Sequence, residues 1–247
     1  MSLAHQSARG TVEAAVHTLA TELAGALRHT GGGGFSLRTC ADVIDEPVGA
    51  LGAVRGLGGD ALAPFLLAGH ALTSDDSALV REAVGAYPAP PSDAADGALW
   101  AARDAALVRV LAALGVRAEG WDGLAAGHLG PTPGEGPAPQ PVTGEWPLLA
   151  AGLARLSSLA LPPVESAERE RARERRTDLD RGLVRALLRR DHLTAARLTR
   201  WLALDAGPDP DPLLRTALGH IAALTPDQPR VQLELAVARR LSKEGAA

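Results

Sequence analysis

The chain has 247 residues, of which 46% are hydrophobic and only 3% aromatic, and its formal net charge at pH 7 is -4. This length is enough for one or two domains with a sizeable core, and the negative charge argues against a general attraction to nucleic acid or anionic membranes. Lys243 is the only lysine, so arginine supplies nearly all the positive charge, which is typical of GC-rich bacterial genomes. A single cysteine, Cys40, excludes an intramolecular disulfide framework and fits a reducing cytoplasm.

Targeting and membrane segments are not expected. Glu13 and Glu22 interrupt the apolar stretch near the N-terminus, which therefore does not resemble a signal peptide. No apolar run approaches the roughly 18 residues that a membrane-spanning helix needs. We therefore expect a soluble, cytoplasmic bacterial protein without membrane contact.

Apolar residues recur at helical spacing along the first half of the chain. Thr11 is a suitable N-cap for a first helix that ends at the glycines at 31–34. Ser36 is the expected N-cap of the next helix, at 36–46. Further helices are predicted at 48–73 with a break near 58–59, 74–87, 96–114 and a short segment reaching 128. Because alanine and leucine are frequent and β-branched and aromatic residues are scarce, the pattern predicts an all-α fold.

The segment 130–147, GPTPGEGPAPQPVTGEWP, is the strongest boundary signal. Its prolines and glycines disfavour both helices and sheet ladders. We therefore predict a Pro/Gly-rich linker at 130–147 between an N-terminal helical lobe at 1–129 and a C-terminal lobe of helical hairpins at 148–247.

The C-terminal half shows four apolar stripes in succession. They are Leu179, Leu183, Val184, Leu187 and Leu188; 193–204; 214–224; and Leu233, Val237 and Leu241. Asp191 marks the first turn, and Asp211 and Pro212 are suited to the N-cap and first position of the third helix. Two antiparallel helix pairs in succession predict stacked α-hairpins.

Two segments resemble helical repeats. LVRALLRRDHLTAARLTRWLALDAGP, at 183–208, resembles a tetratricopeptide-type hairpin, with Asp191 in the turn and Ala195 at the small-residue position. The next helix pair follows at about the 34-residue offset of such repeats. ALTSDDSALVREAVGAY, at 71–87, looks like the inner turn of a HEAT-type repeat. The resemblance implies repeat-like helix packing.

Common catalytic and cofactor motifs do not match this sequence. The glycines at 31–34 are followed by Phe35, without the Lys and Ser/Thr of a P-loop, so a hinge between helices is the preferred interpretation. Arg28, Arg38 and the backbone near Ser36 form the alternative, an anion site. CxxC, HExxH, an EF-hand loop and a Gly-x-Ser-x-Gly elbow are all missing, so neither a metal nor a cofactor is expected.

Three residues are the best candidates for a reactive or small-molecule site: His29, Cys40 and His70. A nucleophilic cysteine needs a nearby base and a lowered pKa, whereas a lone cysteine on a helix is usually a small buried hydrophobe. The alternative function is therefore a helical enzyme or small-molecule-binding protein with a site between the lobes.

The arginine-rich segment 168–190 favours a binding surface. Acidic residues alternate with its arginines, which predicts a solvated, salt-bridged face and disfavours nucleic acid. The candidate partner-binding residues are Arg185, Arg189, Arg197, Arg200 and Trp201, because arginine and tryptophan dominate interface energetics. Trp201 suits the core equally well. The preferred function is a non-catalytic interaction, scaffold or adaptor protein that binds a protein partner, or itself, through a helical groove.

Overall fold

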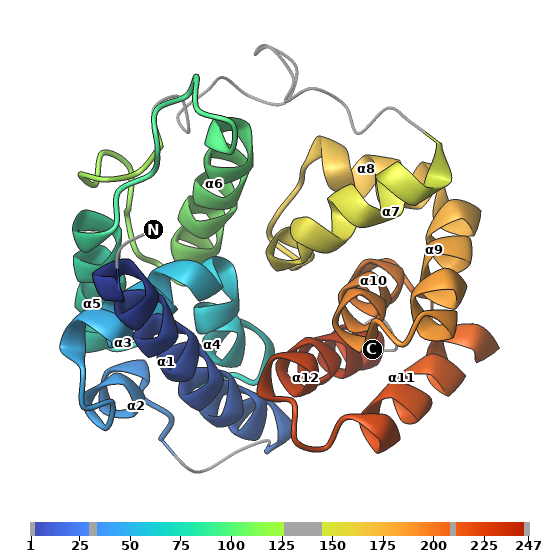
Figure 1. The fold of residues 1–247 in the computed structure, drawn as a ribbon, viewed down its shortest axis with the longest axis horizontal. Helices are drawn as coiled ribbons and strands as arrows, with labels where there is room; N and C mark the ends of the chain where they lie inside the picture. The colour runs from blue at the N-terminus through green and yellow to red at the C-terminus, as the bar shows by residue number, and fades with distance from the viewer. Residues whose placement is uncertain (1–2, 30–33, 126–144, 208–210, 245–247) are drawn as a thin grey trace. The chain divides into compact units, whose positions relative to one another are not determined.

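The computed structural model describes residues 3–29, 34–125, 145–207 and 211–244, which form α-helices and short 3-10 helices without a β-strand. The predicted all-α class is therefore confirmed. By its internal contacts the chain divides into two compact units, Met1–Leu129 and Gly130–Ala247 (Figure 1). Most of the predicted linker at 130–147 lies outside the described residues, but Trp146 and Pro147, at its end, begin a helix.

Unit 1 contains α1 (Leu3–Arg28), α2 (Leu37–Asp42), α3 (Pro47–Leu57), η1 (Gly58–Leu62), α4 (Ala63–Leu67), α5 (Ser74–Ala86) and α6 (Gly97–Ala113). Helix α1 packs against α3 and α4, α3 packs against α5, and α6 packs against η1. The predicted break at 58–59 is confirmed, because α3 ends at Leu57 and its C-cap, Gly58, has a φ of 58°. Thr11 lies inside α1 rather than at its start, and residues 114–125 form turns rather than another helix.

One buried carboxylate joins the starts of α2 and α5. Asp76 completes a capping box with Thr73, and it also accepts hydrogen bonds from the Ser36 hydroxyl at 3.0 Å and the Arg38 backbone N–H at 2.9 Å. Burial alone would raise the pKa of Asp76, but the hydrogen bonds from Arg38, Thr73 and Ser36 outweigh it and lower the pKa. The predicted N-cap Ser36 is confirmed, since its side chain accepts from the Thr39 N–H.

A buried ion pair links α3 to α6 within unit 1. The guanidinium of Arg55 donates to both carboxylate oxygens of Asp104, and the Nη2–Oδ2 distance is 2.9 Å. Arg55 also donates from Nε to the carbonyl of Tyr87 at 2.9 Å, and its guanidinium carbon lies 4.5 Å from the ring centroid of Trp100. Asp104 accepts from the Ala125 N–H at 2.8 Å as well, so the pair also holds the segment after α6.

One stretch, Pro47–Leu67, is long and apolar enough to cross a membrane by length and composition alone. This corrects the expectation that no apolar run reaches that length. The stretch is divided into α3, η1 and α4, and 72% of its most apolar window is buried inside the protein. A core helix of a soluble protein meets the same criterion, so localisation stays a prediction.

Unit 2 contains α7 (Trp146–Arg155), η2 (Ser157–Leu159), α8 (Ala167–Glu174), α9 (Arg176–Leu188), α10 (His192–Leu204), α11 (Pro212–Leu224) and α12 (Pro229–Glu244). Helix α10 is central and packs against α7, α9, α11 and α12 (Figure 1). The N-cap predicted at Asp211 and the first helical position predicted at Pro212 are confirmed. The main contact of α12 is with α10 rather than α11, and repeat-like packing stays a prediction.

Helices α7 and α9 approach closely at Gly182. A Cβ added there would lie 2.5 Å from the Cβ of Ala150 on α7 and 3.3 Å from Leu198 Cδ1 on α10. Only glycine allows this separation without a shift of the backbones. Gly182 therefore fixes the distance between the two helices that carry the candidate site.

The turn from α9 to α10 contains a residue in an unusual conformation. Arg190 has a φ of 58°, the left-handed region in which glycine is the usual residue. The Arg190 N–H donates to the Leu187 carbonyl at 3.0 Å, and the Asp191 N–H donates to the Ala186 carbonyl at 2.9 Å, which are the two bonds of a Schellman motif. The tight turn places the end of α9 beside the start of α10.

Candidate partner-binding site on unit 2

Helix α9 carries two parallel rows of side chains at four-residue spacing. Asp180, Val184 and Leu188 form one row, and Arg181, Arg185 and Arg189 form the row beside it. Leu188 is 81% exposed and Val184 is 41% exposed. The apolar row is therefore on the surface, next to a row of arginines.

This exposure corrects the single core stripe predicted for this helix. Leu179 and Leu183 are buried, together with Gly182 and Ala186, where α9 packs against α7 and α10. The five apolar positions of the stripe span more of the helix surface than these neighbours cover. Val184 and Leu188 remain outside the contact of α9 with α7 and α10. The sequence alone does not show this, because it depends on where those two helices lie.

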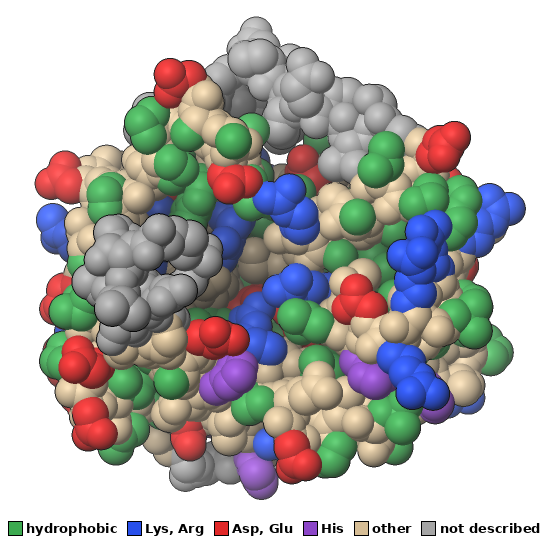
Figure 2. Space-filling model, in the orientation of Figure 1, with side chains coloured by type: hydrophobic (Ala, Val, Ile, Leu, Met, Phe, Trp, Pro, Cys, Tyr) green, Lys and Arg blue, Asp and Glu red, His purple; other side chains and the backbone are tan. Residues whose placement is uncertain are grey.

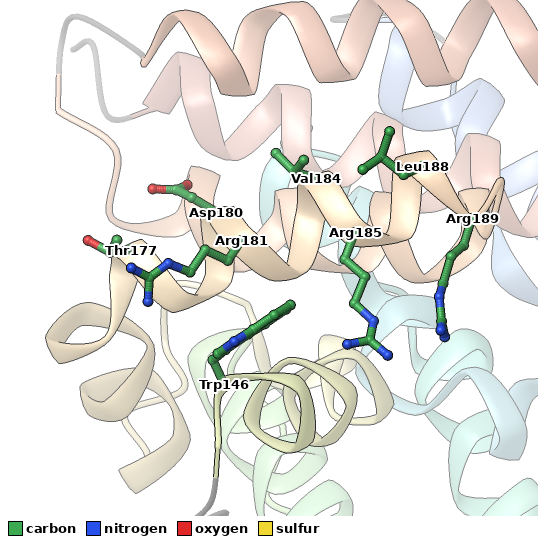
Figure 3. A pocket seen from close by; sticks show the side chains of 8 residues that line it. All are labelled: Trp146, Thr177, Asp180, Arg181, Val184, Arg185, Leu188 and Arg189. Carbon is green, nitrogen blue, oxygen red and sulfur yellow. The ribbon is translucent and has the colours of Figure 1, made fainter.

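The two rows line an apolar groove with Trp146, the first residue of α7. The groove has a volume of about 560 Å³ and is lined by Trp146, Thr177, Asp180, Arg181, Val184, Arg185, Leu188 and Arg189. In Figure 3 Arg185 and Arg189 extend from α9 on the side of Trp146, and Arg181 runs along the helix toward Thr177. Val184 and Leu188 project from the opposite edge of the helix. The Arg185 guanidinium carbon lies 5.5 Å from the Trp146 ring centroid, a cation–π contact.

Asp180 lies at one end of the apolar groove. One of its carboxylate oxygens is buried and has no hydrogen-bond partner among the described residues. Burial raises the pKa of Asp180, Arg176 partly offsets this effect, and the charge of Asp211 adds to the rise. The carboxyl group is therefore protonated more readily than an ordinary aspartate.

A second hollow adjoins the groove, and we call it the arginine depression. Its volume is about 360 Å³, and its lining includes Arg155 from α7, Arg185 and Arg189 from α9, and Arg197 from α10. Trp146, Arg185 and Arg189 line both hollows, which are therefore neighbours. In Figure 2 basic and apolar side chains lie close together over the part of unit 2 that carries α7 and α9.

Two of the candidate partner-binding residues, Arg200 and Trp201, lie in the core of unit 2 and not on its surface. Both are buried, since α10 is surrounded by other helices of unit 2. Trp201 donates from Nε1 to the carbonyl of Leu153 at 2.8 Å, and Arg200 donates to Glu234 at 2.7 Å. Arg185, Arg189 and Arg197 do line the two hollows, but whether a partner binds there remains a prediction.

Glu234 on α12 connects the core to the arginine depression. Its fully buried carboxylate is 2.7 Å from Arg200, 3.1 Å from Arg230 and 3.4 Å from the Nε of Arg197. Burial alone would raise the pKa of Glu234, but the charges of Arg200, Arg230 and Arg197 outweigh it and lower the pKa. Arg197 is 27% exposed, so one arginine contacts both the buried acid and the depression.

The alternative reactive residues, His29, Cys40 and His70, all lie in unit 1. His29 is exposed, with Nδ1 2.9 Å from the Gly25 carbonyl, and the centroid of the His70 ring lies 5.7 Å from that of Phe35, with the two rings tilted by 52°. No hydrogen bond or ring contact joins any two of the three in the part of the chain that the structure describes.

The environment of Cys40 disfavours a reactive thiolate. Burial, followed by the negative charges of Glu22 and Asp76, raises the pKa of the thiol to about 11. A nucleophilic cysteine requires the opposite shift. The geometry therefore offers no support for cysteine catalysis at this position.

Neither a metal-binding cluster among the described residues nor a similar known protein points to a function. No group of three or more His, Cys, Asp or Glu side chains within residues 3–29, 34–125, 145–207 and 211–244 is placed to hold a metal ion. No protein-family model, curated protein or solved structure matches the chain. The functional argument therefore rests on the geometry of unit 2.

Proposed function

We propose that the protein is a non-catalytic interaction or adaptor protein that docks a segment of a partner protein in the apolar groove of α9. The observation that carries this proposal is that the exposed Val184 and Leu188 line one groove together with Trp146 and a row of arginines. Large exposed apolar side chains that gather in a groove mark interaction sites, whereas single scattered ones do not. Tryptophan and arginine are also the residues most enriched at interface hot spots.

The spacing of the exposed apolar side chains favours a helical segment as the ligand. Val184 and Leu188 lie one helical turn apart on α9, and this spacing suits apolar side chains that recur at the same interval on a docked helix. The arginines can cover the edges of such a segment with their methylene stems while their charged groups stay in water. Neither contact requires a reactive group.

The wider arrangement of unit 2 supports a scaffold role. We propose that α9 and α10, which pack together across a tight turn, form a hairpin of the repeat type, with α11 and α12 as the following pair. Such hairpins present open surfaces on which partners dock. A bacterial cytoplasmic location remains part of this proposal.

Affinity purification from the native host tests the function. A double variant, Val184→Ser with Leu188→Ser, should lose a partner that the wild-type chain retains. The matched control is Val43→Ser with Val48→Ser, which removes two valines of unit 1 that are 70% and 64% exposed. We expect the control to retain the partner.

Light scattering on the purified chain covers the case in which the partner is a second copy. Self-association that the control variant keeps and the groove variant loses would then support the same groove. Equal binding by all three chains, or no partner and no self-association, would contradict the proposed function.

A further inference from the structure

The arginine depression provides a second contact for whatever occupies the apolar groove. The two hollows share Trp146, Arg185 and Arg189 in their linings, so a segment longer than one hollow can contact both. The arginines that line the depression come from three helices, α7, α9 and α10. Their convergence depends on the fold and is not a property of one charged helix.

The lining of the depression favours a negative ligand. Asp191 is the one acid among the described residues that line it, against the four arginines Arg155, Arg185, Arg189 and Arg197. The Asp191 carboxylate already accepts a hydrogen bond from the Thr194 N–H at 3.1 Å as the N-cap of α10. The positive end of the α10 dipole therefore partly compensates the charge of Asp191, and the four arginines make the electrostatic potential of the depression positive.

Small residues form part of the surface of the depression between the arginines. Ala150, Ala151 and Ala154 of α7 and Gly182 and Ala186 of α9 all belong to its lining. The close approach of α7 to α9 at Gly182 fills the space between these two helices. A ligand carboxylate would therefore reach the guanidinium groups from the open side of the depression and not from between the helices.

One of the arginines is held in place before any ligand binds. The Nε of Arg197 lies 3.4 Å from the buried carboxylate of Glu234. A side chain that is already ordered loses less rotamer entropy when it binds, which strengthens binding. Arg197 therefore presents a positioned donor at the side of the depression formed by α10.

We infer that the partner segment is acidic and amphipathic, with an Asp or Glu side chain in the arginine depression and an apolar side chain in the adjoining groove. This inference rests on the proposed function and specifies the chemistry of the partner. Arginine forks bind carboxylates through paired, charge-assisted hydrogen bonds. A nucleic acid would satisfy the arginines, but it has no aliphatic side chain to cover Val184 and Leu188.

A displayed library of random 16-residue peptides tests the inference with the full chain as bait. Peptides that also bind the Leu188→Ser variant are removed, so the remaining sequences depend on the groove. We expect these sequences to be enriched in Asp and Glu next to apolar residues. Their binding should weaken about tenfold in Arg189→Gln, the effect of losing one charge-assisted contact.

Two controls separate loss of charge from loss of fold. Arg215→Gln removes an exposed arginine of α11 outside both hollows and should leave affinity unchanged. Arg189→Lys keeps the charge but not the bidentate fork, so its affinity should lie between those of the wild type and Arg189→Gln. Raising the salt concentration should weaken the acidic peptides and leave neutral ones little changed.

The outcomes distinguish the inference from the proposed function. Groove-dependent peptides without acidic enrichment, or with equal affinity for wild type and Arg189→Gln, would overturn the acidic partner while leaving docking in the groove intact. Enrichment of basic peptides would overturn it as well. A library that gives no peptide dependent on Leu188 would contradict the proposed function itself.

Discussion

The two units each contain a buried arginine–carboxylate contact, but the contacts have different surroundings. In unit 1 Arg55 is enclosed: it binds Asp104 and the Tyr87 carbonyl, and its side chain is only 3% exposed. In unit 2 Glu234 binds three arginines, and one of them, Arg197, is 27% exposed. The arginine–carboxylate contact is fully enclosed in unit 1, whereas in unit 2 one of its arginines reaches the surface.

This difference indicates that a buried charge can take part in binding by positioning a surface side chain. A buried ion pair whose donors and acceptors are satisfied within the core mainly specifies packing. Glu234 instead holds an arginine that lines the arginine depression, so the core and the candidate site share a side chain. Removing the acid should therefore affect stability alone in unit 1, and both stability and binding in unit 2.

The largest effect is expected for Asp104→Asn. The substitution leaves the buried Arg55 without a counter-charge, and we expect the free energy of unfolding to fall by about 4 kcal/mol. Urea unfolding of the full chain measures the loss, and hydrogen exchange should assign it to unit 1. Asp93→Asn, which removes an exposed acid, is the control. A loss below about 1 kcal/mol, the scale of an exposed pair, would show that the closed pair contributes little.

Glu234→Gln leaves the buried Arg200 without its counter-charge, but Arg197 and Arg230 are near enough to the surface to regain water. We therefore expect a somewhat smaller loss of about 3 kcal/mol in the free energy of unfolding. Peptide binding in the arginine depression should also weaken. The exposed Glu174→Gln is the control. Unchanged binding in a folded Glu234→Gln chain would remove the proposed link between core and site.

The same acid predicts a pH dependence. The pKa of Glu234 is lower in the folded chain than in the unfolded one, so its stabilising effect is present above the unfolded value, about 4.3, and is lost as pH falls through the folded value. The stability difference between wild type and Glu234→Gln should therefore shrink between pH 5 and pH 2, as measured by urea unfolding. A difference that stays constant over this range would contradict the lowered pKa.

Gly182→Ala tests the distance between α7 and α9. The added methyl group must displace Ala150, and we expect a loss of about 2 kcal/mol together with weaker peptide binding. Gly219→Ala in α11 is a matched control, because nothing lies within 4 Å of its added Cβ and it should gain up to about 1 kcal/mol from helix propensity. Thermal unfolding compares the two. A neutral Gly182→Ala would show that the helices can separate freely.

The smallest effect is expected for Arg190→Gly. A left-handed φ costs a non-glycine residue roughly 1 kcal/mol, while glycine adds entropy to the unfolded chain, so the net gain should be about 0.5 kcal/mol. Arg215→Gly, inside α11, should instead lose about 1 kcal/mol. A destabilised Arg190→Gly chain would mean that the arginine side chain itself stabilises the turn.

Sequence patterns predicted the features that depend on neighbouring residues. The N-caps at Ser36 and Asp211, the break after α3 and the all-α class are local, because each follows from hydrogen bonds or propensities within a few positions. Thr11 shows the limit of this reasoning, since a good capping residue lies inside α1 when the residues before it are also helical.

Features that depend on packing were not predictable in the same way. In sequence Arg200 cannot be told from Arg197, the partly exposed arginine one turn before it on α10, and only the position of Glu234 on α12 makes its burial possible. Val184 and Leu188 fit a core stripe until the positions of α7 and α10 are known. Trp146 follows a Pro/Gly-rich segment and shows its place in the groove only through its contact with Arg185.

The fluorescence of Trp146 can report on occupation of the site, because the other three tryptophans lie elsewhere. Trp100 faces Arg55 and Arg103, Trp121 faces Arg81, and Trp201 is buried, whereas Trp146 lies in both hollows. A ligand carboxylate that draws Arg185 away from the indole at 5.5 Å changes the electric field on that ring. Occupation of the site should therefore shift the emission of Trp146, and titrations can be followed on the unlabelled chain.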